Sequence, residues 1–158
     1  MNKAKKLIFF LLALFPLGVG FIGSLLTEPA INSWYQGLIK PSINPSNEIF
    51  APVWTFLFIL MGISFYLVLI NKSNKGKRES IIVFIVQLVL NLTWSFLFFF
   101  LKRPDLAFFE IIVLWVAILC NIIEFKKISR LASYLLFPYL AWVSFALILN
   151  FLIMRLNS

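Results

Sequence analysis

Long uncharged apolar stretches alternate along this chain with short segments that carry nearly all of its charged residues. Four stretches contain no charge, and a fifth contains a single acid, Glu110. About 20 apolar residues in a helix cross the roughly 30 Å of hydrocarbon in a bilayer, and in lipid a helix satisfies its own backbone hydrogen bonds. The pattern therefore predicts an all-α integral membrane protein. We expect a five-transmembrane-helix bundle that forms a single membrane domain over residues 1–158, with helices at about 7–26, 49–71, 80–101, 106–125 and 131–154.

The first connector, residues 27–48, is long and rich in aromatic residues and proline. Pro29, Pro41 and Pro45 are expected to resist helix continuation. Pro52 is expected in the first turn of the second helix, where a missing N–H costs little. One interpretation of the connector is an aromatic belt at the membrane interface. The other is a stiff lid over a cavity in the bundle, because proline and aromatic side chains limit the freedom of the unfolded loop and add buried area.

Composition and charge narrow the class further. The chain is 62% apolar, whereas soluble domains are about 45–50% apolar. The net charge of +8 is uneven, because most basic residues lie in the N-terminal tail and the second and fourth connectors: Lys3, Lys5, Lys6, Lys72, Lys75, Lys77, Arg78, Lys126, Lys127 and Arg130. The opposite side has Lys40, Lys102, Arg103 and Arg155. This asymmetry predicts a cytoplasmic N-terminus and an external C-terminus. No basic patch coincides with a folded soluble surface, so no nucleic-acid partner is expected.

Two other features limit the chemistry. The lysines followed by an apolar run could be a signal peptide, but the run extends to Leu26 and no A-x-A site follows, so we expect it to be retained as the first helix. Cys120 is the single cysteine and lies within a span, where it cannot form an internal disulfide. The chain has no histidine, which removes the commonest metal ligand and general base, and no metal site is expected.

Polar and aromatic residues share single faces of three predicted helices. The third helix carries Gln87, Asn91 and Trp94 at helical spacing. The fifth repeats the arrangement with Tyr139, Trp142, Ala146 and Asn150, and the second opens with Trp54, Phe58 and Met61. Amides are costly in hydrocarbon unless paired, so these faces must turn inward. The amides could simply hold the helices together. Alternatively, several large flat aromatics with a few hydrogen-bonding groups could form a pocket for a planar apolar ligand.

Two residues within the spans have open roles. Glu110 could be a structural carboxyl, paired with a polar neighbour or protonated, or part of a proton or cation path, and we favour the structural role because no second charge lies in a span. Pro138 is expected to kink the fifth helix, which could shape a cavity wall or relieve packing.

Four motifs occur in order along the chain. They are WYxxLxKP at Trp34–Pro41, PVWT at Pro52–Thr55 followed by MG at Met61–Gly62, QLxLNxxW at Gln87–Trp94, and PYLAWxxFAxxLN at Pro138–Asn150. Together with the five-helix layout, they make the chain similar to the translocator protein family (TspO/MBR), whose members are also called tryptophan-rich sensory proteins or peripheral-type benzodiazepine receptors. The similarity covers nearly the whole chain. The short length and compact loops resemble bacterial members, which implies a multi-pass protein of the bacterial cytoplasmic membrane.

The resemblance implies a pocket among the helices that is closed by the first loop, usually within a homodimer. It implies binding of tetrapyrroles such as protoporphyrin IX, of sterol-like lipids, and of synthetic isoquinoline carboxamide and benzodiazepine ligands. No cofactor is required, since a free-base porphyrin needs no axial ligand. The residues implied to line the pocket are Tyr35, Pro45, Trp54, Asn91, Trp94, Trp142 and Ala146. Glu110 stands where the family carries an acidic residue.

The chain departs from the family near its C-terminus. The family's proposed cholesterol motif has a tyrosine there, whereas Leu149–Arg155 reads LNFLIMR. Phe151 lacks the hydroxyl that would bond a sterol, and the motif is weak in any case. A sterol is therefore not an expected partner.

Three functions compete on this basis. The first is a membrane receptor, sensor or carrier for tetrapyrroles and similar ligands. The second is an enzyme that catalyses light- and oxygen-dependent porphyrin degradation in the same pocket, with Trp54 and Trp142 as the photochemically active residues. The third is an ion-coupled transporter, which is disfavoured because neither inverted repeats nor paired charges within the spans are found.

Overall fold

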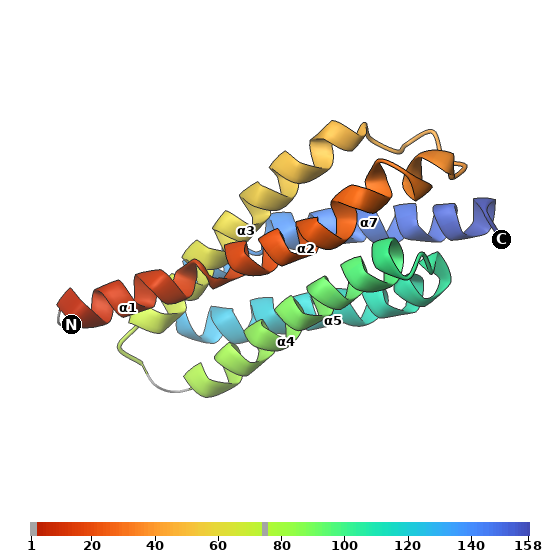
Figure 1. Ribbon diagram of the computed structural model, residues 1–158. Helices are drawn as coiled ribbons and strands as arrows, with labels where there is room; N and C mark the ends of the chain where they lie inside the picture. Colours follow the sequence, from red (N-terminus) through yellow and green to blue (C-terminus); the bar gives the residue numbers. More distant parts are fainter. Residues whose placement is uncertain (1–2, 74–75) are drawn as a thin grey trace.

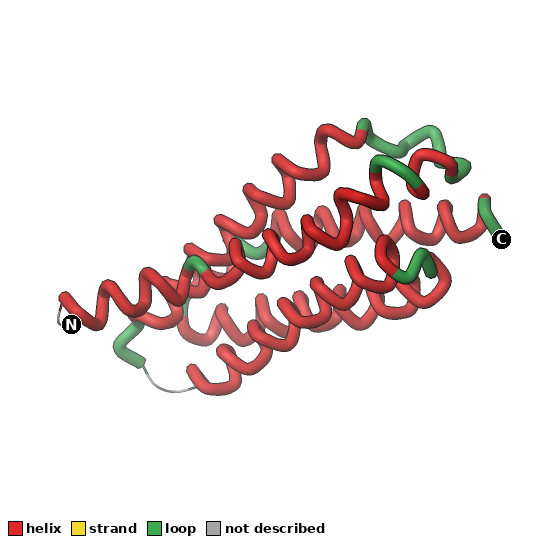
Figure 2. Tube along the Cα trace, in the orientation of Figure 1, coloured by secondary structure: helices red, strands yellow, loops and turns green. Residues whose placement is uncertain are grey.

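The computed structural model of the protein describes residues 3–73 and 76–158, and Lys75 of the second connector lies outside the described residues. Throughout these ranges the chain consists of helices and loops without a strand (Figure 2). Five helical segments are long and apolar enough to cross a membrane: Lys3–Ile31, Asn47–Ile70, Lys77–Phe100, Pro104–Ile128 and Arg130–Leu156. They run roughly along one axis and place the two termini at opposite ends (Figure 1). The predicted five-helix class is confirmed.

The first segment is two helices, α1 (Lys3–Ala13) and α2 (Phe15–Ile31), separated at Leu14. Pro16 lies in the first turn of α2. It has no N–H to donate, and its ring would clash with the carbonyl four residues earlier, so the helix must restart there. Pro29 acts differently from the expectation, because α2 continues through it and ends at Ile31. The connector between the first two spans therefore covers residues 32–46 instead of 27–48.

The second segment is α3 (Asn47–Ile70), which begins earlier than expected, so that Pro52 lies inside the helix and beyond its first turn. Gly62 allows α3 to cross α1 closely. A Cβ at Gly62 would collide with the backbone carbonyl oxygen of Ala13. The small residue is therefore a packing requirement at this crossing, as is common between membrane helices.

The third and fourth segments form an antiparallel pair. The helix α4 (Lys77–Ser95) continues into the π-helical turn η2 (Phe96–Phe100), and a short connector leads to α5 (Pro104–Ile128). Lys102 in this connector has a positive φ of 55°. On its N-terminal side α4 is preceded by Gly76, whose φ of 73° lies in the left-handed region that glycine adopts without steric cost.

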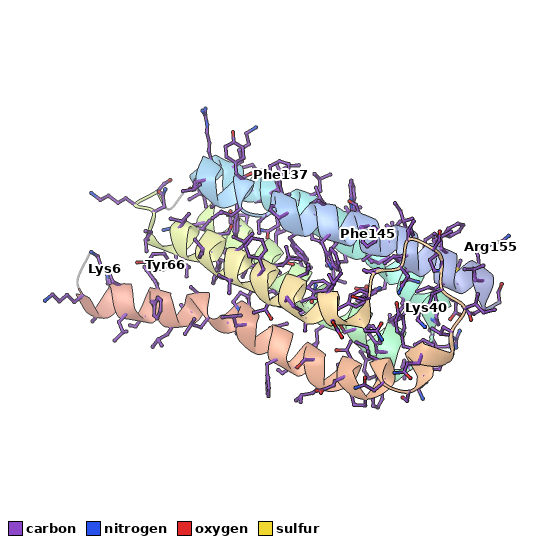
Figure 3. All side chains as sticks on the ribbon, turned by 90° about the horizontal axis from the view of Figure 1, so that it is seen from above. Lys6, Lys40, Tyr66, Phe137, Phe145 and Arg155 are labelled. Atoms are coloured by element: carbon purple, nitrogen blue, oxygen red, sulfur yellow. The ribbon has the colours of Figure 1, made fainter. Side chains whose placement is uncertain are left out.

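The last segment is also interrupted, into α6 (Arg130–Tyr134) and α7 (Phe137–Leu156). Pro138 lies in the first turn of α7. The expected kink within one helix is therefore a restart of the helix, for the same reason as at Pro16. Figure 3 shows Lys6 at one end of the bundle and Lys40 and Arg155 near the other.

Stacked aromatic rings fill the bundle toward the connector between α3 and α4. Phe65 of α3 stacks on Phe84 of α4 with ring centroids 4.3 Å apart, and Phe84 stacks on Phe125 of α5 at 5.6 Å. Close to this layer, the fully buried Gln87 donates from Nε2 to the Met61 sulfur at 3.9 Å, and its Oε1 has no partner among the described residues. Toward the other end α3 diverges from the rest of the bundle (Figure 1), which leaves room for the cavity described next.

Candidate functional site: an indole-lined cavity

A cavity of about 550 Å³ lies between α2, α3, α4 and α7, in the half of the bundle nearest the 32–46 connector. Four helices contribute to its wall, and most of the lining side chains are apolar or aromatic. They are Leu17, Gly20, Phe21, Gly23, Ser24, Thr27, Glu28, Ile31, Asn47, Phe50, Ala51, Trp54, Thr55, Phe58, Asn91, Trp94, Ser95, Phe99, Trp142 and Ala146.

The wall from α3 is a row of aromatic rings. Phe50, Trp54 and Phe58 are each four residues apart, so they lie on one face of the helix. The indole of Trp54 lies against the ring of Phe58 at a centroid distance of 5.7 Å and meets the ring of Tyr139 edge-on at 6.2 Å. These contacts fix the plane of the Trp54 indole at the cavity surface.

The wall from α4 combines an amide with a second indole. Asn91 donates from Nδ2 to the Tyr139 hydroxyl at 3.0 Å, and among the described residues its amide oxygen accepts no hydrogen bond. Trp94 donates from Nε1 to Asn150 Oδ1 at 3.0 Å. Asn150 in turn donates from Nδ2 to the carbonyl oxygen of Pro104 at 2.8 Å. The Trp94 indole is therefore held by a hydrogen-bond chain that joins α4, α7 and the start of α5.

The wall from α7 holds the third indole. Trp142 and Ala146 are four residues apart on one face of α7. The Trp142 ring meets Phe50 edge-on at 6.1 Å and lies 5.6 Å from the ring of Phe145. Among the described residues, neither Trp54 nor Trp142 donates its indole N–H to a protein acceptor, so both N–H groups are available to a ligand.

Half of the wall from α2 is made of small residues, Gly20, Gly23, Ser24 and Thr27. A Cβ at Gly20 would lie 2.5 Å from the ring of Phe58, so the glycine allows this ring to pack against the α2 backbone. Ser24 and Thr27 donate their hydroxyls to carbonyl oxygens of their own helix, to Phe21 at 2.7 Å and Gly23 at 2.6 Å. They therefore present methylene and methyl surface with little unsatisfied polarity.

The family follows from comparison with known proteins. The profile of the TspO/MBR family matches residues 12–156. The chain belongs to the TspO/MBR family. The resemblance carried by the four sequence motifs is thereby confirmed, and the protein is a multi-pass membrane protein of this family.

Relatives in the TspO/MBR family come from bacteria and animals. The chain is 44% identical over 142 residues to Tryptophan-rich protein TspO of Chlorobaculum tepidum, which covers 89% of this chain and 90% of that protein. It is 34% identical over 141 residues to Translocator protein of Homo sapiens, with 87% and 82% covered. It is 32% identical over 126 residues to Tryptophan-rich sensory protein of Cereibacter sphaeroides, with 80% and 78% covered.

Most of the pocket residues implied by the TspO/MBR resemblance meet in this cavity. The side chains placed in its wall are Trp54, Asn91, Trp94, Trp142 and Ala146. Tyr35 and Pro45 are not placed there. Tyr35 lines a much smaller cavity of about 30 Å³ beneath the connector, and Pro45 lines neither. That these residues bind a ligand stays a prediction.

Tyr35 instead anchors the connector of this TspO/MBR protein. It belongs to the 3₁₀ turn η1 (Trp34–Gly37) and is 3% exposed. Its hydroxyl donates to Asn44 Oδ1 at 2.8 Å, and the Lys40 ammonium lies 4.9 Å from its ring centroid. Burial raises the pKa of the Tyr35 hydroxyl above its usual range, so the group stays a neutral donor at physiological pH.

The side-chain amide of Asn157, near the C-terminus, also holds this connector in place. Ile39 donates its backbone N–H to Asn157 Oδ1 at 2.9 Å, and Asn157 Nδ2 donates back to the Ile39 carbonyl oxygen at 2.9 Å. The side-chain amide of Asn157 thus exchanges two hydrogen bonds with the backbone of Ile39, as paired residues of neighbouring β-strands do. The pairing joins the middle of the connector to the end of α7.

The α2 wall and the anchor at Asn157 were not predicted from the sequence. Gly20, Gly23, Ser24 and Thr27 form a face of small residues, which is the usual signal for close helix packing in membranes; here the face borders a cavity.

Glu110 lies on α5 outside the cavity wall. Among the described residues none donates a hydrogen bond to its buried carboxyl oxygens, so of the two structural alternatives, pairing with a polar neighbour and a protonated carboxyl, the pairing is not seen there.

Proposed function

We propose that this protein is a membrane receptor, sensor or carrier that binds tetrapyrroles, protoporphyrin IX among them, and similar flat apolar ligands. The observation that supports this most is the convergence of Trp54, Trp94 and Trp142, from three different helices, on one cavity. Its volume of about 550 Å³ lies within the roughly 300–1,000 Å³ of typical small-molecule sites. The names of the relatives, a tryptophan-rich sensory protein and a translocator protein, agree with a sensor or carrier role.

In this proposal Trp54 and Trp142 contact the faces of the ligand. Stacking on an indole supplies contact area in a fixed geometry. Asn91 orients the polar edge of the ligand through its amide oxygen, and the two free indole N–H groups can donate to ligand acceptors. Sterols fit this set poorly, because they offer no aromatic face to stack.

The 32–46 connector acts as a stiff lid in the same proposal. Support comes from the hydrogen bond of the Tyr35 hydroxyl to Asn44, which braces the connector internally, and from the Asn157 amide, which ties Ile39 to the end of α7. Proline and buried aromatic residues lower the entropy that ordering such a segment would otherwise cost. A lid held in this way would exclude water from the bound ligand without a large rearrangement.

The test is a titration with protoporphyrin IX of the full chain in nanodiscs, followed by the shift of the porphyrin Soret band. The Trp54→Phe, Trp142→Phe double variant should raise Kd by about fivefold to a hundredfold, because each lost indole contact contributes about 0.5–1.5 kcal/mol. Trp115→Phe is the matched control, since Trp115 donates to Ser144 at 2.8 Å and does not line the cavity. Equal Kd values for the wild type and the double variant would remove the assignment.

A second candidate function is an enzyme that degrades porphyrin in a light- and oxygen-dependent reaction, with Trp54 and Trp142 as the catalytic residues. The observation in its favour is that two oxidisable indoles border the same cavity. An excited porphyrin could take an electron from an indole, with dioxygen as the final oxidant. Illumination under oxygen should then bleach the bound Soret band faster than that of porphyrin in empty nanodiscs. Equal bleaching rates would leave a binding protein without this activity.

We further propose that the N-terminal end faces the cytoplasm of a bacterial cell, that the C-terminal end faces outside, and that the protein is a homodimer. The uneven distribution of lysine and arginine supports the orientation. Labelling of a cysteine introduced near either terminus with a membrane-impermeant reagent tests it. Mass measurement of intact complexes released from nanodiscs tests the dimer.

A further inference from the structure

The charge of the cavity wall is confined to one position. Of the described residues that line the cavity, Glu28 alone carries a charge. No lysine or arginine belongs to the lining of the described chain. Lys40 of the nearby connector donates to the carbonyl oxygens of Gln36 and Leu38, at 3.2 and 3.3 Å, and lies over the Tyr35 ring. A ligand in the cavity therefore meets a carboxylate and no countering cation.

Glu28 lies at the loop end of the cavity, in the last turn of α2. It is exposed and takes part in neither ion pair of the described chain, which join Arg103 to Asp105 and Lys127 to Glu124. The carbonyl groups at the end of α2 add a partial negative charge near the same place. The first turn of α3 contributes a partial positive charge, but Glu48 lies in that turn and offsets it. Together these charges make the electrostatic potential at the mouth of the cavity negative.

We propose that Glu28 is a specificity-determining residue of the cavity: among flat aromatic ligands of the same ring system it favours those whose outer edge is neutral or cationic, so that protoporphyrin IX binds, but more weakly than its neutral derivatives. The inference rests on the proposed function, since it assumes that the cavity binds flat aromatic ligands. It adds to the proposed function which charge the outer edge of a ligand carries when the site accepts it. A like charge beside the ligand is unfavourable, and apolar walls weaken the screening that bulk water would provide.

Protoporphyrin IX and its dimethyl ester form a suitable pair of probes, because they share one ring system and differ in two carboxylates. Dissociation constants are measured for both in nanodiscs of neutral phosphatidylcholine at pH 7.5, and the ratio of acid to ester Kd is compared between variants. Comparing ratios cancels the greater partition of the ester into lipid. Glu28→Gln should lower the ratio by about twofold to fivefold, the range that an exposed charge pair produces. Glu28→Lys should lower it further.

Glu48→Gln is the matched control, because it removes the same charge on the same side of the bundle, from an exposed residue next to Asn47 that does not line the cavity. Because Glu48 contributes to the negative field at the mouth without lining the cavity, its removal should lower the ratio by no more than about 1.5-fold. An unchanged ratio in Glu28→Gln, or an equal change in Glu48→Gln, overturns the role of Glu28 while the proposed function stands. Binding of both probes that is insensitive to the Trp54→Phe, Trp142→Phe double change overturns both proposals, since the probes would then lie outside the cavity.

Discussion

Replacing Asn150 with leucine removes the amide that connects three elements of the bundle. Asn150 is 1% exposed, accepts a hydrogen bond from Trp94 at 3.0 Å and donates one to Pro104 at 2.8 Å. Leucine has the same branching at Cγ and the same number of side-chain heavy atoms, so the substitution leaves no void. It leaves the Trp94 N–H and the Pro104 carbonyl without their partner. Ring packing continues to hold Trp94, which stacks on Phe98 at 5.4 Å.

The expected cost is about 1–3 kcal/mol of unfolding free energy. Interhelical hydrogen bonds in membrane proteins contribute about 0.6 kcal/mol on average and up to about 1.7, and two are lost. Asn121→Leu is the control, because Asn121 is equally buried at 1% exposed, yet its Nδ2 has no partner within the described residues. There the change should be close to neutral, since an unpaired amide group is removed together with the side chain.

A double-mutant cycle with Trp94→Phe isolates the hydrogen bond between the two side chains. Unfolding by sodium dodecyl sulfate in mixed micelles, followed by far-ultraviolet circular dichroism, gives the four free energies. We expect a coupling of about 0.5–1.5 kcal/mol between Trp94 and Asn150. Effects that add within about 0.3 kcal/mol would refute the reasoning, because the indole would then be positioned by ring packing alone.

Four further substitutions, one of them a control, test other parts of the fold. Gly62→Ala should lower the unfolding free energy by about 1–3 kcal/mol, because the new Cβ meets the α1 backbone. Gly18→Ala is the control: nothing lies within 4 Å of the new Cβ, so the substitution should stabilise α2 by about 0.5–1 kcal/mol. Equal effects of the two substitutions in the micelle assay would contradict this reasoning. Gln87→Met should raise the midpoint of thermal unfolding by about 2–4 °C, because it removes a buried oxygen that has no partner in the described chain. A lower midpoint would contradict this, because the amide would then have an essential partner. Asn157→Ala should speed hydrogen exchange of the Ile39 amide about tenfold, because two hydrogen bonds are lost. The exchange rate is measured by mass spectrometry of the peptide that contains Ile39, and an unchanged rate would contradict the prediction.

The five spans could be predicted from sequence because the thickness of a bilayer leaves few alternatives for a long uncharged run. The break in the last span was predicted only as a kink at Pro138, and the break in the first span was not predicted. The apolar run from Leu7 to Leu26 continues through Pro16 without a charged residue, so hydropathy alone does not show that α1 ends at Ala13. Proline is an ambiguous guide here. Pro16 and Pro138 start new helices, whereas Pro29 and Pro52 lie inside continuous ones.

The candidate site could be predicted where its residues are large. Trp54, Trp94 and Trp142 lie on polar or aromatic faces with helical spacing, and the structure brings all three to one cavity. The opposite wall could not be found in this way. Gly20 and Thr27 look like ordinary packing residues, and only the divergence of α3 turns their face into the side of a cavity.

The connector and the cavity share one layer of aromatic rings, which explains how a loop residue can matter to a pocket that it does not line. Phe98 of η2 contacts Trp34 at 5.8 Å and Tyr35 at 6.2 Å on the loop side. On the cavity side the same ring stacks on Trp94 at 5.4 Å. Displacing Tyr35 would therefore disturb the support of a wall indole before it changed any contact with a ligand. Because the loop and the wall are packed on the same ring, the stiffness of the connector and the shape of the cavity depend on each other.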